Sequence, residues 1–193
     1  MIVILGESAS GKDTLANALV KHDPKKYRKL VLFTTRPRRD GEENGFDYRF
    51  VTELAFEEFR KRNFFAHTAC YNNWYYGIPA CELKGNTDGL VAVLTPAAMR
   101  DLKKQGVQFT SVYLYVDRPS RIVAMIDQRG DGVDEAYRRS LFDAGQFDGV
   151  ENEVDFIIDN PKYQMSMEQA LDCLLNALED KPLNGEPTED DAK

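Results

Sequence analysis

The chain has 193 residues, of which 42% are hydrophobic, and 25 Lys and Arg against 32 Asp and Glu give a net charge of −7. This length and composition favour one compact domain with a full hydrophobic core. The acidic balance argues against a general attraction to nucleic acid or membranes, and no apolar run approaches the ~20 residues of a membrane span. Three widely spaced cysteines favour reduced thiols and a cytoplasmic location over a disulfide framework or a zinc site.

The N-terminal segment is predicted to be a strand, a glycine-rich turn and a helix. The apolar run 1–5 precedes GESASGKD at 6–13, and leucines with helical spacing follow it. The pattern GxxxxGK between a strand and a helix indicates a phosphate-binding loop. Glycines allow the tight turn and the approach of phosphate oxygens to backbone N–H groups, while the lysine neutralises phosphate charge. The predicted donor-binding residues are Gly6, Glu7, Ser8, Ala9, Ser10, Gly11, Lys12, Asp13 and Thr14.

Asp13 stands where such loops usually offer a Ser or Thr hydroxyl to Mg²⁺. Because Mg²⁺ takes one or two carboxylates together with waters and phosphates, Asp13 is predicted to be a metal ligand. The alternative is a loop that has lost its phosphate-binding function, in which the extra negative charge repels a triphosphate. Both interpretations stay open at the level of the sequence.

The rest of the chain alternates strands and helices, with an interruption in the middle. The predicted elements are strand 29–34, an aromatic-rich segment 34–83 with a helix at 53–62, strand 90–94, a helix from Pro96 to Gly106, strand 112–116, a helix opened by Pro119, a polar segment 127–148, strand 154–158 and helix 167–178. This order predicts an α/β fold with a P-loop NTPase-type parallel sheet flanked by helices. We expect one domain at 1–181, with its core at 1–33 and 84–181, an inserted acceptor lobe at 34–83 and a helical lid at about 127–148. The acidic tail 182–193 is predicted to be disordered.

A second phosphate site is predicted directly after strand 29–34. The run TTRPRRDGEENGFDY at 34–48 carries three arginines within four residues, on a segment that a proline stiffens. Guanidinium groups bind phosphate with two parallel hydrogen bonds, which a lysine cannot do. Tyr48, together with Tyr75 or Tyr76, is expected to add hydroxyl donors. The alternative is a solvated basic loop balanced by nearby acids.

With the phosphate loop, the run at 34–51 and WYYGIP at 74–79, the chain resembles the guanylate kinase family over most of residues 1–160. The resemblance implies transfer of the γ-phosphoryl group of ATP to GMP, with Mg²⁺. It implies that the acceptor phosphate is held by Arg36, Arg39, Tyr48 and Tyr76. It also implies that lid arginines hold the donor phosphates, with Arg129 as one and Arg138 or Arg139 as another, and that Asn160 faces the donor adenine.

The family's guanine-reading positions differ in this chain. The resemblance places His67, Ile78 and Pro96 where the family uses a carboxylate, a hydroxyl and an acid. A site that lacks these acceptors loses discrimination, although a histidine can keep one acceptor nitrogen. The acceptor-binding residues are therefore predicted to include His67 and Ile78. An ordinary solvent-facing histidine is the alternative interpretation of His67.

We therefore predict an ATP-dependent nucleoside monophosphate kinase, with GMP as the best acceptor. Its predicted catalytic residues are Lys12, Arg36, Arg39, Arg129 and Arg139. The same chemistry on ribose 1,5-bisphosphate or a deoxynucleotide is one alternative, and a catalytically inactive binding module is another. The expected partners are small nucleotides, without nucleic acid or membrane, and the chain is expected to be a monomer or a homodimer.

Overall fold

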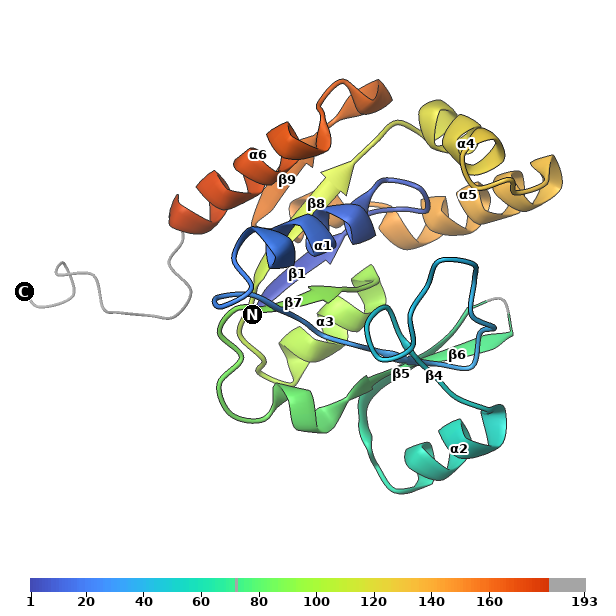
Figure 1. Cartoon of the computed structure of the whole chain (residues 1–193), viewed down its shortest axis with the longest axis vertical. Coiled ribbons are helices and arrows are strands. Elements are labelled where there is room, and N and C mark those ends of the chain that lie inside the picture. Colours follow the sequence, from blue (N-terminus) through green and yellow to red (C-terminus); the bar gives the residue numbers. More distant parts are fainter. Residues whose placement is uncertain (72, 181–193) are drawn as a thin grey trace, which may run out of the picture.

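The core of the protein is a five-stranded parallel sheet in a computed structural model that describes residues 1–71 and 73–180 (Figure 1). The strand order is β2-β7-β1-β8-β9, and each neighbouring pair runs parallel. The strands are β1 (Ile2–Leu5), β2 (Arg28–Lys29), β7 (Leu90–Val93), β8 (Thr110–Tyr115) and β9 (Phe156–Asp159). The predicted α/β class with a parallel core is confirmed.

Alternate residues of β1 enter two hydrophobic layers, because successive side chains of a strand point to opposite faces. Ile2 and Ile4 pack under α1 (Lys12–His22) and α6 (Met167–Asp180). Val3 and Leu5 pack on the other face, against α3 (Pro96–Lys104). All four side chains are fully buried. Helices on both faces explain why β1 is a continuous apolar run.

A second, mixed sheet holds the strands between 33 and 79, in the order β4-β3-β6-β5. These strands are β3 (Phe33–Thr34), β4 (Arg49–Phe50), β5 (Phe65–Tyr71) and β6 (Trp74–Pro79). β3 pairs parallel with β4 and antiparallel with β6, which pairs antiparallel with β5. Helix α2 (Glu53–Lys61) is capped by Thr52, whose side chain accepts the Ala55 N–H. We call this unit the acceptor lobe, after the role that the sequence predicts for it.

The strand predicted at 29–34 is in fact two strands in two different sheets. β2 pairs with β7 of the core, whereas β3 pairs inside the acceptor lobe. The N–H of Leu30 still donates to Val91 O, but Leu32 O already accepts from the N–H of Arg49. The chain therefore passes from the core to the lobe between these two residues. A continuous run of strand-forming residues does not reveal such a change of partner.

The segment between β8 and β9 is helical and lies beside the end of the core sheet (Figure 1). Asp117 caps α4 (Arg118–Asp127), and α5 (Val133–Phe147) follows. Short 3₁₀ turns at Ala80–Leu83, Val150–Asn152 and Pro161–Tyr163 complete the described elements. None of the helices in 1–71 and 73–180 is long and apolar enough to cross a membrane. The predicted tail, 182–193, lies outside the described residues.

Candidate active site

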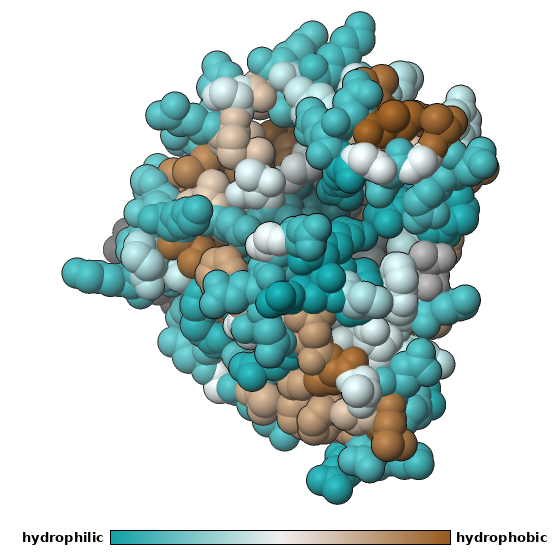
Figure 2. Space-filling model, turned by 45° about the vertical axis from the view of Figure 1, so that its right-hand side comes forward, coloured by the Kyte–Doolittle hydropathy of each residue, from teal (hydrophilic) through white to brown (hydrophobic). Residues whose placement is uncertain are grey.

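A cavity of about 990 Å³ lies between the phosphate loop, the acceptor lobe and α5. Figure 2 shows this face hollowed, with hydrophilic side chains around the hollow. Many of the predicted site residues line the cavity: Gly6, Ser8, Lys12, Asp13, Arg36, Arg39, Tyr48, His67, Tyr76, Ile78, Arg129 and Arg139. The others are absent from its lining: Glu7, Ala9, Ser10, Gly11, Thr14, Arg138 and Asn160. The predicted site residues span 154 positions, from Gly6 to Asn160, and only some of them line the cavity.

Two glycines shape the phosphate loop in different ways. A Cβ on Gly6 would lie 2.3 Å from Ser10 Oγ and 3.0 Å from Leu114 O, so a larger residue does not fit. Gly11 has a φ of 90° and is the N-cap of α1. The first N–H groups of α1 have no partner within the helix, and together with the helix dipole they favour an anion at this end. The loop thus has the local form of a phosphate site.

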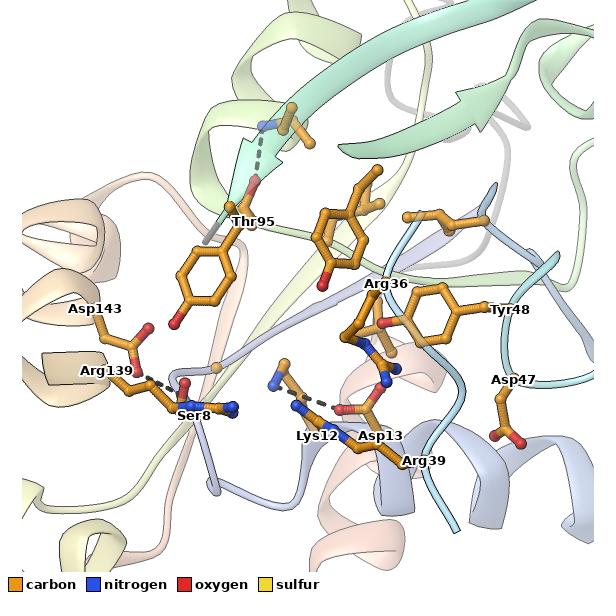
Figure 3. A pocket seen from close by; sticks show the side chains of 18 of the residues that line it. Ser8, Lys12, Asp13, Arg36, Arg39, Asp47, Tyr48, Thr95, Arg139 and Asp143 are labelled. Carbon is orange, nitrogen blue, oxygen red and sulfur yellow. Dashed lines mark hydrogen bonds and ion pairs between the residues drawn. The ribbon is translucent and has the colours of Figure 1, made fainter. Parts of the chain in front are cut away.

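Lys12 and Asp13 lie at the cavity end of α1 (Figure 3). Lys12 Nζ is 3.4 Å from Asp13 Oδ2 and donates to Glu7 O at 3.5 Å. Burial favours the neutral acid, but the charges of Lys12, Lys29 and Arg129 outweigh it and lower the pKa of Asp13. Asp13 is therefore an ionised, half-exposed carboxylate in a cationic surrounding.

Glu7 and Asp143 form a buried network with Arg121 behind the loop. Glu7 accepts hydrogen bonds from Tyr113 Oη at 2.8 Å and from Arg121 Nη2 at 3.0 Å. Asp143 Oδ2 accepts the backbone N–H of Ser8 at 2.8 Å and lies 3.7 Å from Arg121 Nη1. The Glu7 side chain thus serves the architecture of the loop. Asp143, which lines the cavity, was not predicted as a site residue.

The arginine run after β3 contributes a second cationic cluster to the lining of the cavity. Arg36 is buried, and its guanidinium donates to Glu42 Oε1 at 2.6 Å and lies 5.4 Å from the Tyr48 ring centroid. Glu42 Oε2 accepts the Arg39 N–H at 2.8 Å, so one carboxylate orders the whole turn. Burial raises the pKa of Glu42, but these donors outweigh it and the pKa is lowered. Glu42 therefore also belongs to the candidate site, although in the sequence it looks like any acid that balances the arginines.

Arg39 reaches the cavity from an exposed position and has cationic neighbours (Figure 3). Partial desolvation and the charges of Arg36 and Arg139 lower its pKa. Burial and then the negative charge of Asp13 raise the pKa of Tyr48, so its hydroxyl remains protonated and able to donate. The cluster therefore presents several donors and an excess of positive charge to any anion in the cavity.

Only one of the adjacent arginines 138 and 139 faces the cavity. Arg139 is buried on α5, held by Glu135 at 2.7 Å, and lines the cavity. Arg138 also binds Glu135, but its guanidinium lies 5.9 Å from the Tyr71 ring centroid, and it does not line the cavity. Arg129 lines the cavity from just beyond α4.

Asn160 and Lys29 have contacts that the sequence did not indicate. The Asn160 side chain is buried and pairs with both backbone groups of Met165, so it shapes the loop between β9 and α6. Lys29 lines the cavity from β2, donates to Asn17 at 3.0 Å and lies 3.6 Å from Asp47. Lys29 thus joins α1 to the segment that carries Tyr48. A basic residue in a short strand gives no local signal of this role.

The end of the cavity near α3 is mostly apolar. Its side chains come from the β2–β3 connection, β7, α3 and α5: Leu32, Val93, Leu94, Ala97, Ala98 and Phe147. Ile78 and His67 lie here as neighbours, paired in the register of β5 and β6. His67 is mostly buried, with 11% of its side chain exposed, so the solvent-facing alternative is wrong. Pro96 does not line the cavity and forms the first turn of α3.

The comparisons with known proteins agree with this geometry. The guanylate kinase family model matches residues 1–180. A guanylate kinase from Nostoc is 30% identical over 178 residues, covering 91% of this chain and 88% of that protein, and one from Gloeobacter violaceus is 29% identical, covering 96% and 91%. The crystal structure of guanylate kinase from Anaplasma phagocytophilum superposes with a TM-score of 0.68 at 23% identity, covering 95% of this chain and 87% of that chain. The predicted resemblance is confirmed.

Proposed function

Since this chain belongs to the guanylate kinase family, we propose that it transfers the γ-phosphoryl group of ATP to GMP. One observation carries the proposal: two clusters of residues suited to binding phosphate, from different parts of the chain, line a single cavity. The loop with Lys12 contributes one cluster, and Arg36, Arg39 and Tyr48 contribute the other. Two phosphate sites in one cavity fit a donor and an acceptor that are both phosphorylated.

Phosphoryl transfer depends mainly on positioning the donor and acceptor phosphates and on stabilising the negative charge of the transferring group. Lys12 and the N-terminus of α1 would hold the donor phosphates. Arg39 and Arg139, whose charges already repel each other in the cavity, would be stabilised by the negative charge of the transferring group. A phosphate acceptor is anionic near neutral pH, so its oxygen can attack without a general base.

The residues present fit a magnesium ion, with Asp13 as its protein ligand. Asp13 is ionised and half-exposed beside Lys12. Within the described residues, no three His, Cys, Asp or Glu side chains group as a metal site, so an ion here would take its other ligands from phosphates and water, as Mg²⁺ does. When bound, Mg²⁺ neutralises charge on the donor phosphates.

A contact between α5 and the acceptor lobe supports the exclusion of water. The Tyr71 ring of β5 packs edge-on against Phe142 of α5, with centroids 4.6 Å apart. Arg138 lies against the same tyrosine ring. The proposed lid and the lobe thus meet beside the cavity. Closure over the phosphates would favour transfer to the acceptor over hydrolysis.

Two features bear on the alternatives. The retained Gly6, Gly11 and Lys12 disfavour a binding module without catalysis. The apolar end of the cavity carries His67 where the family has a carboxylate. For this reason ribose 1,5-bisphosphate and deoxynucleotides remain acceptors to be tested. The cytoplasmic location and the monomeric or homodimeric state remain predictions.

A coupled assay of ADP release over a panel of acceptors tests the proposal. GMP should support the highest kcat/KM, and the panel should include ribose 1,5-bisphosphate and dGMP. Lys12→Ala should abolish transfer without unfolding the protein, whereas Lys25→Ala, at an exposed position on the surface, should change nothing. Near wild-type turnover of Lys12→Ala would remove the loop as the donor site.

A further inference from the structure

Ala9 of the phosphate loop has a backbone conformation that alanine rarely adopts. Its φ is 66°, and the N–H of Ser10 donates to Glu7 O at 3.1 Å, so residues 7–10 form a turn with Ala9 at its third position. Glycine or asparagine ordinarily supplies a positive φ at this position of a β-turn, because a Cβ makes it unfavourable. Contacts from outside the turn must therefore hold Ala9 in this conformation.

Tyr163 makes a direct contact of this kind. Its hydroxyl donates a hydrogen bond to Ala9 O at 2.7 Å, across 154 positions of the sequence. The side chain of Ala9 also packs among buried residues of helices α4 and α5: Ala124, Met125 and Ala136. Tyr163 lies in the turn between β9 and α6 and does not line the cavity, so it acts on a ligand there through Ala9. None of the roles assigned above uses this hydroxyl.

The turn that carries Tyr163 also has an unusual backbone conformation. Lys162 and Tyr163 have φ values of 56° and 52°, although neither residue is a glycine. The Lys162 N–H donates to Asp117 Oδ2 at 2.9 Å, and Asp117 is the N-cap of α4. This bond joins the turn to the start of α4, while the Tyr163 hydroxyl joins it to the phosphate loop. Residues with positive φ persist only where their surroundings compensate for the cost, and here two such segments meet in one hydrogen bond.

We propose that Tyr163 is a positioning residue for the donor nucleotide, because its hydroxyl holds Ala9 and the phosphate loop in the conformation that binds phosphate. The proposal rests on the donor role proposed above for this loop. A return of Ala9 to negative φ would rotate the peptide group between Ser8 and Ala9, and with it a backbone N–H of the loop. Such N–H groups are what a phosphate loop offers to its ligand. The apparent Kd for the donor therefore rises as the fraction of molecules with the correct loop conformation falls.

A double-mutant cycle on ADP binding tests this inference. Tyr163→Phe keeps the ring and removes the hydroxyl, so the Kd for ADP should rise by about 3- to 10-fold while the KM for the acceptor changes little. In the Ala9→Gly background the same replacement should have a clearly smaller effect, because glycine adopts a positive φ without a Cβ. Comparison within each background removes the separate cost of losing the Ala9 methyl group. Equal fold-changes in the two backgrounds would show that Tyr163 does not act through Ala9.

Controls separate this role from damage to the fold and from failure of the donor site. Tyr137→Phe removes the hydroxyl of an exposed tyrosine on α5 and should leave the Kd for ADP unchanged. Thermal unfolding reports on the fold. Without nucleotide, the backbone amides of residues 6–13 should exchange hydrogen faster in Tyr163→Phe than in the wild type, and equal rates would contradict the proposal.

Lys12→Ala distinguishes the two ways in which the proposal could fail. If Lys12→Ala weakens ADP binding but a folded Tyr163→Phe protein binds ADP as the wild type does, the donor site stands and the role of Tyr163 is overturned. If the wild type does not bind ADP, or if Lys12→Ala binds it equally well, the proposed donor site fails and this inference fails with it.

Discussion

Asp143 Oδ2 accepts a hydrogen bond from the backbone N–H of Ser8 at 2.8 Å, across 135 positions of the sequence. The bond joins α5 to the phosphate loop (Figure 3). Asp143 is 5% exposed, and Arg121 lies between its carboxylate and that of Glu7. Because Arg139 lies one helical turn before Asp143, this bond also sets the position of Arg139 relative to the loop. Asp143 is thus a positioning residue for the proposed reaction.

Removal of this carboxylate should impair both stability and turnover. Asp143→Ala leaves the Ser8 N–H and Arg121 Nη1 short of a partner, and we expect the free energy of unfolding to fall by about 1–3 kcal/mol. Displacement of Arg139 should lower kcat several-fold, up to about 100-fold, with a smaller change in KM for the acceptor. Asp143→Asn keeps an acceptor oxygen and should lie between the two.

Denaturant unfolding and steady-state kinetics measure these effects, with Asp134→Asn as the control on the exposed first turn of the same helix. A folded Asp143→Ala protein with wild-type kcat would show that the bond to Ser8 does not position Arg139.

The phosphate loop could be predicted from sequence because its chemistry is local. Gly6, Gly11 and Lys12 lie within seven residues, and each has a role that its residue type dictates. Asp143 could not be predicted in this way, because an aspartate on a polar helix resembles any solvated residue until the fold brings it to Ser8. Tyr163 is a similar case, since 154 positions separate it from Ala9, to which its hydroxyl donates.

Helix geometry explains why the lid arginines were only partly predicted. Successive residues of an α-helix point about 100° apart, so two adjacent arginines cannot both face one cavity. The sequence does not fix the rotation of α5, and Arg139 rather than Arg138 turned out to line the cavity. The buried Ala136, Ser140 and Asp143 show which face of α5 is turned inward.

Lysine replacements should separate the two arginines of the acceptor cluster. Arg36 is 5% exposed and bonded to Glu42 and Pro37 O, so Arg36→Lys should lower the free energy of unfolding by about 1–3 kcal/mol and also raise the acceptor KM. Arg39 is exposed, and Arg39→Lys should raise the acceptor KM while leaving stability within about 0.5 kcal/mol. Unfolding curves and kinetics over acceptor concentration test both, with Arg62→Lys as an exposed control outside the cavity. Unchanged acceptor kinetics in both variants would place the acceptor phosphate elsewhere.

Glu135 should make the stability of the protein depend on acid pH. Hydrogen bonds from Arg138 and Arg139 lower its pKa from 4.5 to about 2. The unfolded state therefore binds a proton at higher pH than the folded state does, and stability rises with pH across this window. The contribution of Glu135 should be fully present above pH 4.5 and lost as the pH falls towards 2.

Glu135→Gln removes this titration, so the mutant should lose stability less steeply than the wild type between pH 4.5 and 2. Urea unfolding at several pH values measures both slopes, with Glu168→Gln on the first turn of α6 as a control. Parallel slopes for the wild type and Glu135→Gln would contradict the ion pairing of Glu135 with the two arginines.

The two interpretations of Asp13, as a metal ligand or as a repulsive charge, predict opposite effects of Asp13→Ser on activity. If the carboxylate binds Mg²⁺, Asp13→Asn should raise the Mg²⁺ concentration needed for half-maximal activity by about 10-fold or more, because a neutral amide is a weaker ligand for a hard cation. Asp13→Ser should recover only part of the loss, since the described residues hold no group of three His, Cys, Asp or Glu side chains that could bind the metal in its place. If Asp13 only repels the triphosphate, Asp13→Ser should instead raise kcat/KM for ATP.

Mg²⁺ titrations at fixed ATP distinguish these outcomes, and binding of ADP with and without Mg²⁺ gives a readout that is independent of turnover. We expect the metal-binding result, because the charges of Lys12, Lys29 and Arg129 already keep Asp13 ionised at the mouth of the loop. These same cations reduce the repulsion that a carboxylate would exert on a triphosphate. A more active Asp13→Ser enzyme with an unchanged Mg²⁺ requirement would refute the role of Asp13 as a metal ligand.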